Sequence, residues 1–205
     1  HGTLLLKGKP PYLYPFPWAR FDLRMQVYIG GGELYCTYDA AYAAPKVCGC
    51  CGLSLSYGPL PTIGLGQVGG GVGLRIVIDT GPRYGHAIAI YYDGVLVQRV
   101  PMVGGWQRKA WVALRIGYRT YDSPAGLIIE RDGAADLRDL ILGDMAPSHT
   151  WQMAISASTG MAVDEHLVDE LTLSTDALIA PTPVQVEVTL NGQQFTRSRA
   201  ELIYD

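Results

Sequence analysis

Residues 73–80, GLRIVIDT, carry the pattern that decides the fold. Leu74, Ile76 and Ile78 fall on one face of an extended strand, because successive side chains of a strand point to opposite faces. Turn-forming residues follow in GPRYG, and HAIAIYYDG, residues 86–94, resumes the extended apolar pattern. A strand, a turn and a second strand of this kind predict an antiparallel sheet.

The same pattern recurs along the chain on both sides of this pair. The runs are FDLRMQVYI (21–29), GLSLSY (52–57), GVLVQRV (94–100), WVALRIGY (111–118), AGLIIERDG (125–133), WQMAISAS (151–158) and HLVDELTL (166–173). Glycine-rich turns separate them, and GAADLRDLILGDM (133–145) fits either a short helix or another strand. Eight or more such strands predict an all-β chain folded as a β-sandwich or jelly roll.

The composition excludes several classes of protein. Apolar residues make up 48% of the 205 residues and charged residues only 17%, which is untypical of disorder. The formal net charge of -3 leaves no basic surface for nucleic acid, and the one basic cluster, Arg108 with Lys109, is small. No apolar run reaches the roughly 20 residues of a membrane helix, so membrane insertion is not expected. The proline-rich beginning does not fit a signal peptide, and we expect the chain to be a mature piece of a longer protein.

Four cysteines lie within sixteen residues: Cys36, Cys48, Cys50 and Cys51. Two disulfides with three alternative pairings are the favoured interpretation. A zinc site is a weaker alternative, because structural zinc sites usually use two separated C-x₂₋₄-C knuckles, and free thiols remain a third alternative. Disulfides predict an oxidising compartment, and hence an extracellular or cell-surface protein.

The order of these runs resembles the concanavalin A-like domain, also called the L-type or legume-type lectin domain, from about Pro15 to Thr175. The most specific pieces are GLRIVIDT, where the family has a strand that ends in Asp-Thr, and ISASTG (155–160), which is followed by a histidine. The resemblance implies a jelly roll of two large sheets over residues 1–177.

The resemblance also implies a metal and sugar site. The family's lectin members bind sugar beside a calcium and a transition metal, and the matching residues here are Asp79 and His86. Val77 stands where the family has a glutamate, and the short loop after Asp79 adds no carboxylate. Calcium remains a candidate ligand, but it takes 6 to 8 oxygens, so a full calcium site is not expected. Cys51 replaces the family's sugar-binding aspartate, and the only asparagine is Asn191, outside the lectin-like region. The calcium-dependent mechanism does not transfer, and no cofactor is expected.

An acidic cluster, VDEHLVDE (163–170), is the one candidate catalytic site. Alternation places Glu165 and Asp169 on one face of a strand, and Asp164 and Glu170 on the other. Retaining glycosidases place two carboxylates about 5 to 5.5 Å apart. Those on this fold draw them from one strand with a Glu-x-Asp-x-(x)-Glu pattern, and this string is absent. We interpret the cluster as a solvated sandwich edge, and the protein as a non-enzyme with no catalytic residues.

Thirteen tyrosines are the remaining candidates for binding. Aromatic rings stack on sugars or proline-rich chains without a metal. The candidate ligand surface consists of Tyr35, Tyr38, Tyr84, Tyr91 and Tyr92. The alternative is that these tyrosines only cover sheet faces, as is usual in β-rich proteins.

Two prolines in LIAPTP, residues 178–183, indicate a boundary, after which VQVEVTLNGQQF alternates again. This tail is similar to the last strands of TIG-type or filamin-type immunoglobulin-like domains. We therefore expect a lectin-like sandwich over residues 1–177, and a linker with partial immunoglobulin-like strands over residues 178–205.

Two functions follow. The first is a non-catalytic extracellular interaction or structural module that contacts other extracellular proteins, neighbouring domains of the same chain, or glycans weakly. The alternative is an active carbohydrate-binding lectin with a rearranged, metal-poor site.

Overall fold

The computed structural model describes residues 2–8, 20–30, 52–60, 69–80, 86–119, 126–143, 145, 147, 151–158, 165–175, 184–189 and 200–202. Its strands are β1 (Gly2–Gly8), β2 (Arg20–Gly30), β3 (Gly52–Gly58), β4 (Leu74–Asp79), β5 (Ala87–Tyr92), β6 (Val95–Pro101), β7 (Trp111–Arg119), β8 (Gly126–Arg131), β9 (Ala134–Leu140), β10 (Gln152–Ser158), β11 (Glu165–Thr175), β12 (Val184–Thr189) and β13 (Ala200–Leu202). The described part of the chain contains no helix long and apolar enough to span a membrane.

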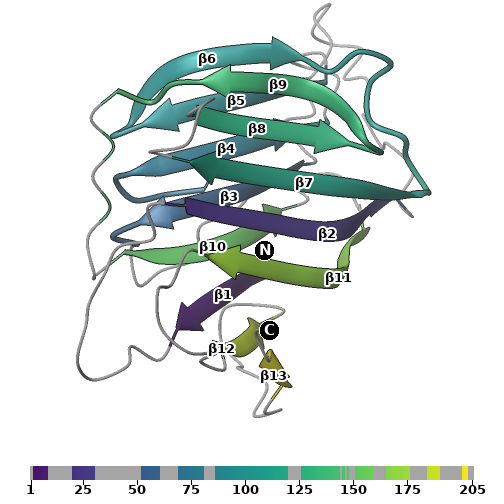
Figure 1. Cartoon of the computed structure of the whole chain (residues 1–205). Helices are drawn as coiled ribbons and strands as arrows, with labels where there is room; N and C mark the ends of the chain where they lie inside the picture. Colours follow the sequence, from purple (N-terminus) through teal and green to yellow (C-terminus); the bar gives the residue numbers. More distant parts are fainter. Residues whose placement is uncertain are drawn as a thin grey trace, which may run out of the picture.

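The strands form two antiparallel sheets that lie face to face, as Figure 1 shows. The larger sheet has eight strands in the order β13-β12-β1-β10-β3-β4-β5-β6, and the smaller has five in the order β11-β2-β7-β8-β9. This arrangement confirms the all-β sandwich that the sequence predicts. All nine alternating runs form strands, and the ambiguous segment after residue 133 forms β9 rather than a helix.

The core lies between the two sheets and is built from alternate residues of each strand. On β2 the buried positions, none more than 3% exposed, are Phe21, Leu23, Met25, Val27 and Ile29. Facing strands supply Leu53, Leu55, Tyr57, Ile76, Ile78, Ile88 and Ile90. Each large side chain buried in this way contributes about 1.5–3 kcal/mol. Because alternation sends the residues between them outward, the outer faces of the sheets are where polar chemistry gathers.

Two Asp-Gly turns close neighbouring hairpins. Asp93 and Gly94, between β5 and β6, have φ angles of 48° and 81°, and Asp132 and Gly133, between β8 and β9, have 47° and 78°. Two-residue turns with positive φ at both positions match the twist of the strands, and they favour Asp-Gly. Both aspartate carboxylates also accept a backbone hydrogen bond at 2.9 Å, from Gly73 and from β7. The DG pairs in the sequence therefore fix the register of both hairpins.

The C-terminal strands continue the larger sheet. β12 pairs antiparallel with β1, from Thr3 opposite Thr189 to Gly8 opposite Val184, and β13 pairs with β12. The expected immunoglobulin-like character of this tail is therefore not supported, because its backbone hydrogen bonds go to β1. The division into two domains after residue 177 stays a prediction.

β1 itself is the strand that the sequence pattern misses. It pairs with β10 on one side and with β12 on the other, so it lies inside the sheet. Its sequence, GTLLLKG, holds three consecutive leucines and no alternation. A short apolar run of this kind carries no period that separates a strand from a buried helix.

Candidate functional site

The residues predicted from the metal site of the lectin family lie near the edge of the eight-stranded sheet. Arg75 and Asp79 point outward from β4 with Val77, since the alternate residues Leu74, Ile76 and Ile78 are buried in the core. Arg75 stands opposite Tyr91 of β5, and Arg99 of β6 stands opposite Ala89. Directly paired residues share a face of the sheet. We call Arg75, Asp79, Tyr91 and Arg99 the β4–β6 surface.

Asp79 is paired with a side-chain cation. Arg99 Nη2 lies 3.9 Å from Asp79 Oδ2, and the two side chains are 38% and 19% exposed. A contact this long and this solvated is a weak ion pair. Arg99 nevertheless supplies a positive charge beside the Asp79 carboxylate, where the family resemblance implies a metal ion.

His86 directly precedes β5, and its imidazole accepts a hydrogen bond from the backbone. The residue has a φ of 35°, and its Nδ1 accepts a hydrogen bond from the N–H of Trp106 at 3.1 Å. A neutral imidazole that accepts at Nδ1 carries its proton on Nε2, so neither nitrogen keeps a lone pair for a metal. The structure therefore gives His86 a backbone partner, and the residual metal pair of Asp79 and His86 stays a prediction.

The described residues at this position do not fit a calcium ion. Calcium takes 6–8 oxygen ligands, and Asp79 supplies the only carboxylate between residues 74 and 92. No group of three or more His, Cys, Asp or Glu side chains in the described part of the chain could hold a metal. Any ligand bound at this position would therefore contact the Asp79 carboxylate and the Arg99 guanidinium directly.

A second arginine fixes the loop that contacts His86. Arg131, which is 11% exposed, donates from Nη1 to the carbonyl of Gly105 at 2.6 Å and pairs with the buried carboxylate of Asp136. The hydrogen bond to Asp136 raises the pKa of Arg131 above its ordinary value. Because Trp106 follows Gly105, this ion pair holds the donor to His86 in place.

The two described tyrosines of the predicted ligand surface lie on different faces. The guanidinium of Arg75 sits over the Tyr91 ring, 4.2 Å from its centroid, on the outer face. Tyr92 packs against the core instead. Neighbouring residues of a strand point to opposite faces, so these two rings do not form one surface.

The acidic cluster lies where the sequence predicts, on the edge of the sandwich. β11 is the edge strand of the five-stranded sheet, and the side chains of Glu165, Asp169 and Glu170 are exposed. A bulge follows Asp169, and Glu170 has a φ of 50°. The exposure of these three carboxylates agrees with the interpretation of a solvated edge.

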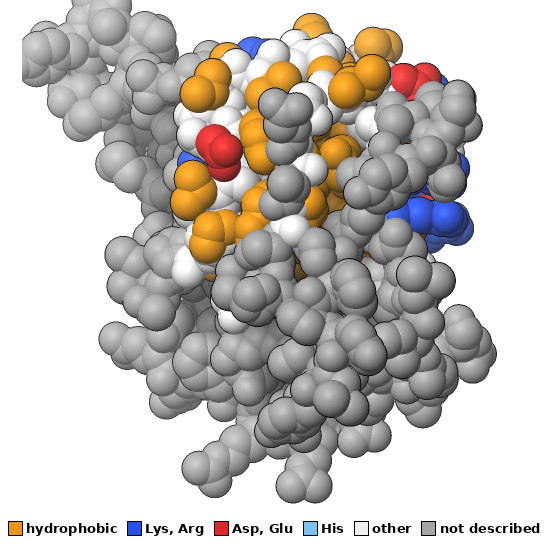
Figure 2. Space-filling model, turned by 60° about the vertical axis from the view of Figure 1, so that its left-hand side comes forward, with side chains coloured by type: hydrophobic (Ala, Val, Ile, Leu, Met, Phe, Trp, Pro, Cys, Tyr) orange, Lys and Arg blue, Asp and Glu red, His pale blue; other side chains and the backbone are white. Residues whose placement is uncertain are grey.

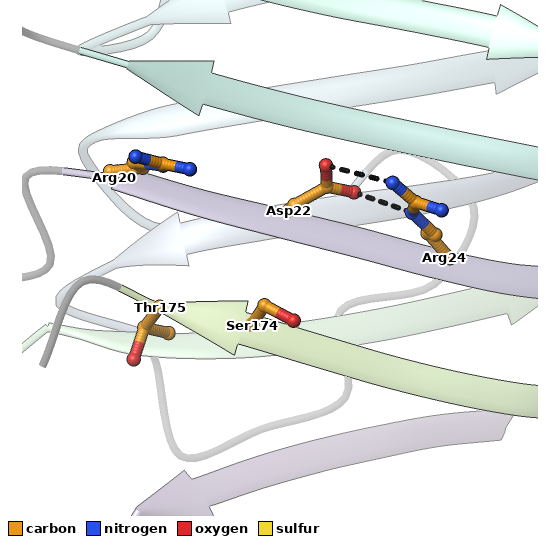
Figure 3. Close-up of a pocket in the computed structure, with 5 residues that line it drawn as sticks. All are labelled: Arg20, Asp22, Arg24, Ser174 and Thr175. Carbon is orange, nitrogen blue, oxygen red and sulfur yellow. Dashed lines mark hydrogen bonds and ion pairs between the residues drawn. The ribbon is translucent and has the colours of Figure 1, made fainter. Parts of the chain in front are cut away.

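A hollow that sequence reasoning misses lies on the outer face of the five-stranded sheet. It has a volume of about 390 Å³ and is lined by Arg20, Asp22, Arg24, Ser174 and Thr175. Figure 3 shows the three charged side chains along β2 and the two hydroxyl residues at the end of β11. The pairing of β11 with β2 brings these residues together, because Ser174 stands directly opposite Asp22. We call it the β2–β11 hollow.

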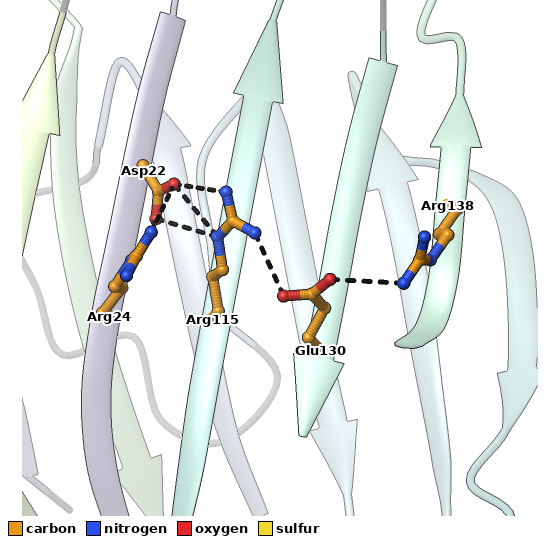
Figure 4. A network of polar contacts seen from close by, with 5 residues as sticks. All are labelled: Asp22, Arg24, Arg115, Glu130 and Arg138. Carbon is orange, nitrogen blue, oxygen red and sulfur yellow. Dashed lines mark hydrogen bonds and ion pairs between the residues drawn. The ribbon is translucent and has the colours of Figure 1, made fainter. Parts of the chain in front are cut away.

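The floor of this hollow belongs to a charged network that crosses four strands (Figure 4). Arg115 Nη2 donates to Asp22 Oδ2 at 2.6 Å, and its Nη1 donates to Glu130 at 3.1 Å. Arg24 adds a second contact to Asp22 at 3.1 Å, and Arg138 lies 3.7 Å from Glu130. Burial raises the pKa of Asp22, but the hydrogen bonds and charges of Arg115 and Arg24 outweigh it, so its net pKa lies below the ordinary value. Asp22 therefore stays ionised at neutral pH.

Comparisons with known proteins agree on the fold. No protein-family model and no curated protein matches the sequence. Among solved structures, the chain is similar to the carbohydrate recognition domain of Emp47p, with 14% identity, 85% of this chain and 75% of that chain covered, and a TM-score of 0.53. It is also similar to the exoplasmic/lumenal domain of VIP36 bound to Ca²⁺ and Man3GlcNAc, with 16% identity, coverage of 78% and 70%, and a TM-score of 0.54. The fold is that of the L-type lectins.

This likeness confirms the concanavalin A-like jelly roll that the sequence resemblance implies, and it concerns the fold alone. Several residues singled out in the sequence lie outside the described residues. They are Cys36, Cys48, Cys50, Cys51, Tyr35, Tyr38, Tyr84, Asp164 and Asn191. The disulfides and the wider tyrosine surface therefore stay predictions.

The lectin-like sandwich also exposes an apolar patch at the end where β5 passes into β6. Its members, which are 44–70% exposed, are Val72, Val95, Leu96, Val97 and Ile141. Figure 2 shows hydrophobic side chains gathered over the described part of this side of the molecule. Since β4 ends where β5 begins, Asp79 lies at the opposite end of the same strands.

Proposed function

We propose that the chain is a non-catalytic carbohydrate-recognition module that binds neutral glycans at the β4–β6 surface without a metal ion. The observation that carries this proposal is the set of polar groups on the outer face of β4, β5 and β6. A carboxylate and a guanidinium stand 3.9 Å apart at one end of this face, and a tyrosine ring under a second guanidinium lies at the other end. Together they offer the acceptor, the donors and the aromatic ring that orient a polar ligand.

The dimensions of the surface suit a short oligosaccharide. Arg75 and Asp79 lie four residues apart on one strand, which corresponds to about 13 Å at roughly 3.3 Å per residue. Asp79 accepts hydrogen bonds from sugar hydroxyls, and Arg99 donates hydrogen bonds to sugar oxygens. The Arg75–Tyr91 pair forms the other end, where the guanidinium plane and ring edge contact the ligand.

The solved relatives support this choice of ligand class and setting. One is a carbohydrate recognition domain, and the other is an exoplasmic or lumenal domain bound to Man3GlcNAc. We infer a secreted or lumenal location for this chain, and mannose-containing glycans as the first ligands to test. No cofactor takes part in the proposed binding.

A glycan array probed with the wild-type chain and with Asp79→Asn tests the proposal. Loss of one charged hydrogen-bond partner should weaken binding about tenfold or more. Asp139→Asn is the matched control, because Asp139 is exposed on β9 in the other sheet and its positive φ of 58° suits asparagine. Equal binding by the wild type and by Asp79→Asn would place the glycan elsewhere, and an array without any binding would refute the function.

A second candidate function, contact with another extracellular protein or a neighbouring domain, is favoured by the apolar patch. A monomer seldom exposes adjacent large apolar side chains without a partner. A photo-crosslinking residue at Val95, in the secreted full-length protein, should capture a specific partner. The same group at the exposed Gln152 should capture none, and equal labelling at both positions would contradict a docking role.

A further inference from the structure

The β2–β11 hollow has no part in the proposed function, and its chemistry differs from that of the β4–β6 surface. Its lining consists of two guanidiniums, two hydroxyls and one carboxylate. Guanidinium groups only donate hydrogen bonds, and hydroxyls both donate and accept. A hollow with this lining suits a ligand rich in acceptor oxygens.

The charge around the hollow is positive although the whole chain is acidic. Asp22 is already engaged by Arg115 and Arg24, and Arg115 also holds Glu130. On the outer face of β2, β7 and β8, the four arginines Arg20, Arg24, Arg115 and Arg119 outnumber the two carboxylates of Asp22 and Glu130, in a chain whose formal net charge is -3. β11 adds the exposed carboxylates of Asp169, which stands opposite Gln26, and of Glu170, so the positive excess is confined to these three strands.

The strand register places like charges against one another beside the hollow. Arg20 stands directly opposite Arg119, and Arg24 stands directly opposite Arg115. Like charges at directly opposed positions destabilise a sheet. Asp22, between the two pairs, offsets the repulsion of the second pair through its contacts with Arg24 and Arg115. The first pair places the side chain of Arg119 beside that of Arg20 at this end of the hollow.

Arg24 has N–H donors that can bind an anion in addition to Asp22. Its side chain is 63% exposed, and its two contacts with Asp22 measure 3.1 and 3.5 Å. A guanidinium has five N–H donors, so most of those of Arg24 face solvent at the rim of the hollow. Figure 3 shows Arg24 at one end of the row of charged residues and Arg20 at the other, with the hydroxyl residues beside them.

We propose that the β2–β11 hollow binds a sulfate or carboxylate group carried by an anionic glycan. Arg20 and Arg24 hold the anionic group, and Ser174 and Thr175 contact sugar hydroxyls. The lining contains no apolar or aromatic side chain, so it offers a peptide no pocket for side-chain anchors. The site lies on the outer face of the opposite sheet from the β4–β6 surface, and the two sites bind independently.

Calorimetric titration with a heparin-derived sulfated oligosaccharide and with a hyaluronan-derived carboxylated oligosaccharide tests the site. At least one should bind, and the arm that binds identifies the anionic group. Arg24→Gln and Arg20→Gln should each raise its Kd about tenfold or more, because each removes charged hydrogen bonds. Arg138→Gln is the matched control, because it removes an equal charge from an equally exposed arginine (65%) of the same face, away from the hollow. It should change the Kd by less than about twofold at physiological salt, since exposed charges beyond about 8 Å are screened.

Three results would overturn the proposal: no binding of either oligosaccharide, equal losses in Arg24→Gln and Arg138→Gln, or tighter binding of a polyglutamate peptide. A melting curve for each variant shows that the sandwich is intact, and Ser174→Ala, which keeps every charge, should weaken binding on its own. Asp79→Asn should leave binding of the anionic glycan unchanged, and Arg24→Gln should leave binding of neutral glycans unchanged. Failure of one site is thereby distinguished from failure of the other.

Discussion

Replacing Arg115 by methionine removes the centre of the charged network on the five-stranded sheet while keeping most of the aliphatic stem. Arg115 makes a 2.6 Å contact with Asp22 and a 3.1 Å contact with Glu130, and all three side chains are only 18–27% exposed. Exposed ion pairs contribute about 0.2–1 kcal/mol, whereas breaking a fully buried pair costs about 3–5 kcal/mol. This half-buried network lies between those limits, and we expect a loss of about 2 kcal/mol in the free energy of unfolding at pH 7.

The pH dependence of that loss follows from the lowered pKa of Asp22. A carboxyl whose folded pKa is lowered stabilises the fold above its unfolded pKa of about 3.9, and this contribution disappears as the pH falls through the folded value. The difference between wild type and Arg115→Met should therefore be full at pH 7 and shrink below about pH 4.

Urea denaturation at both pH values measures the difference, provided that the m-value is unchanged. Arg138→Met is the control, because its 3.7 Å contact is made by a side chain that is 65% exposed, and it should cost less than about 0.5 kcal/mol. Equal losses for the two variants, or a loss for Arg115→Met that stays constant down to pH 3, would refute the network as described.

Four further predictions concern the core, the metal, the cysteines and the tail. Leu55→Ala, at a fully buried position of β3, should cost about 2–5 kcal/mol in urea denaturation. Calorimetry should detect no calcium binding tighter than about millimolar, and micromolar binding abolished by Asp79→Ala would contradict this. Mass spectrometry without reductant should show four protons lost from the four cysteines, and free thiols in secreted material would count against disulfides. Hydrogen exchange at Val186 of β12 should approach that at Ile76 of β4 if the tail is part of the sandwich, and fast exchange would favour a separate domain.

The strands and their turns are predictable because they depend on local chemistry. A few consecutive residues are enough to predict the strand from the alternation on β2 and the turn from the Asp93–Gly94 pair. β1 is missed because its three leucines have no alternation, and only its pairing with strands far along the chain defines it.

The candidate sites depend on register, which the sequence does not reveal. Asp79 and His86 are singled out by the resemblance to the lectin family, but Arg99 and Trp106 reach them only through the fold. The β2–β11 hollow is harder to predict from the sequence, because Ser174 lies beside Asp22 only through the pairing of β11 with β2. Neither segment alone contains a pattern that predicts the hollow.

Equilibrium binding of a mannose-containing oligosaccharide, measured with added calcium and again with excess EDTA, tests the central claim most directly. A polar surface in which Arg99 supplies the positive charge beside Asp79 predicts the same Kd in both conditions, and a weaker one in Arg99→Gln. Binding that EDTA abolishes, or that Arg99→Gln leaves untouched, would contradict the metal-free recognition proposed for this sandwich.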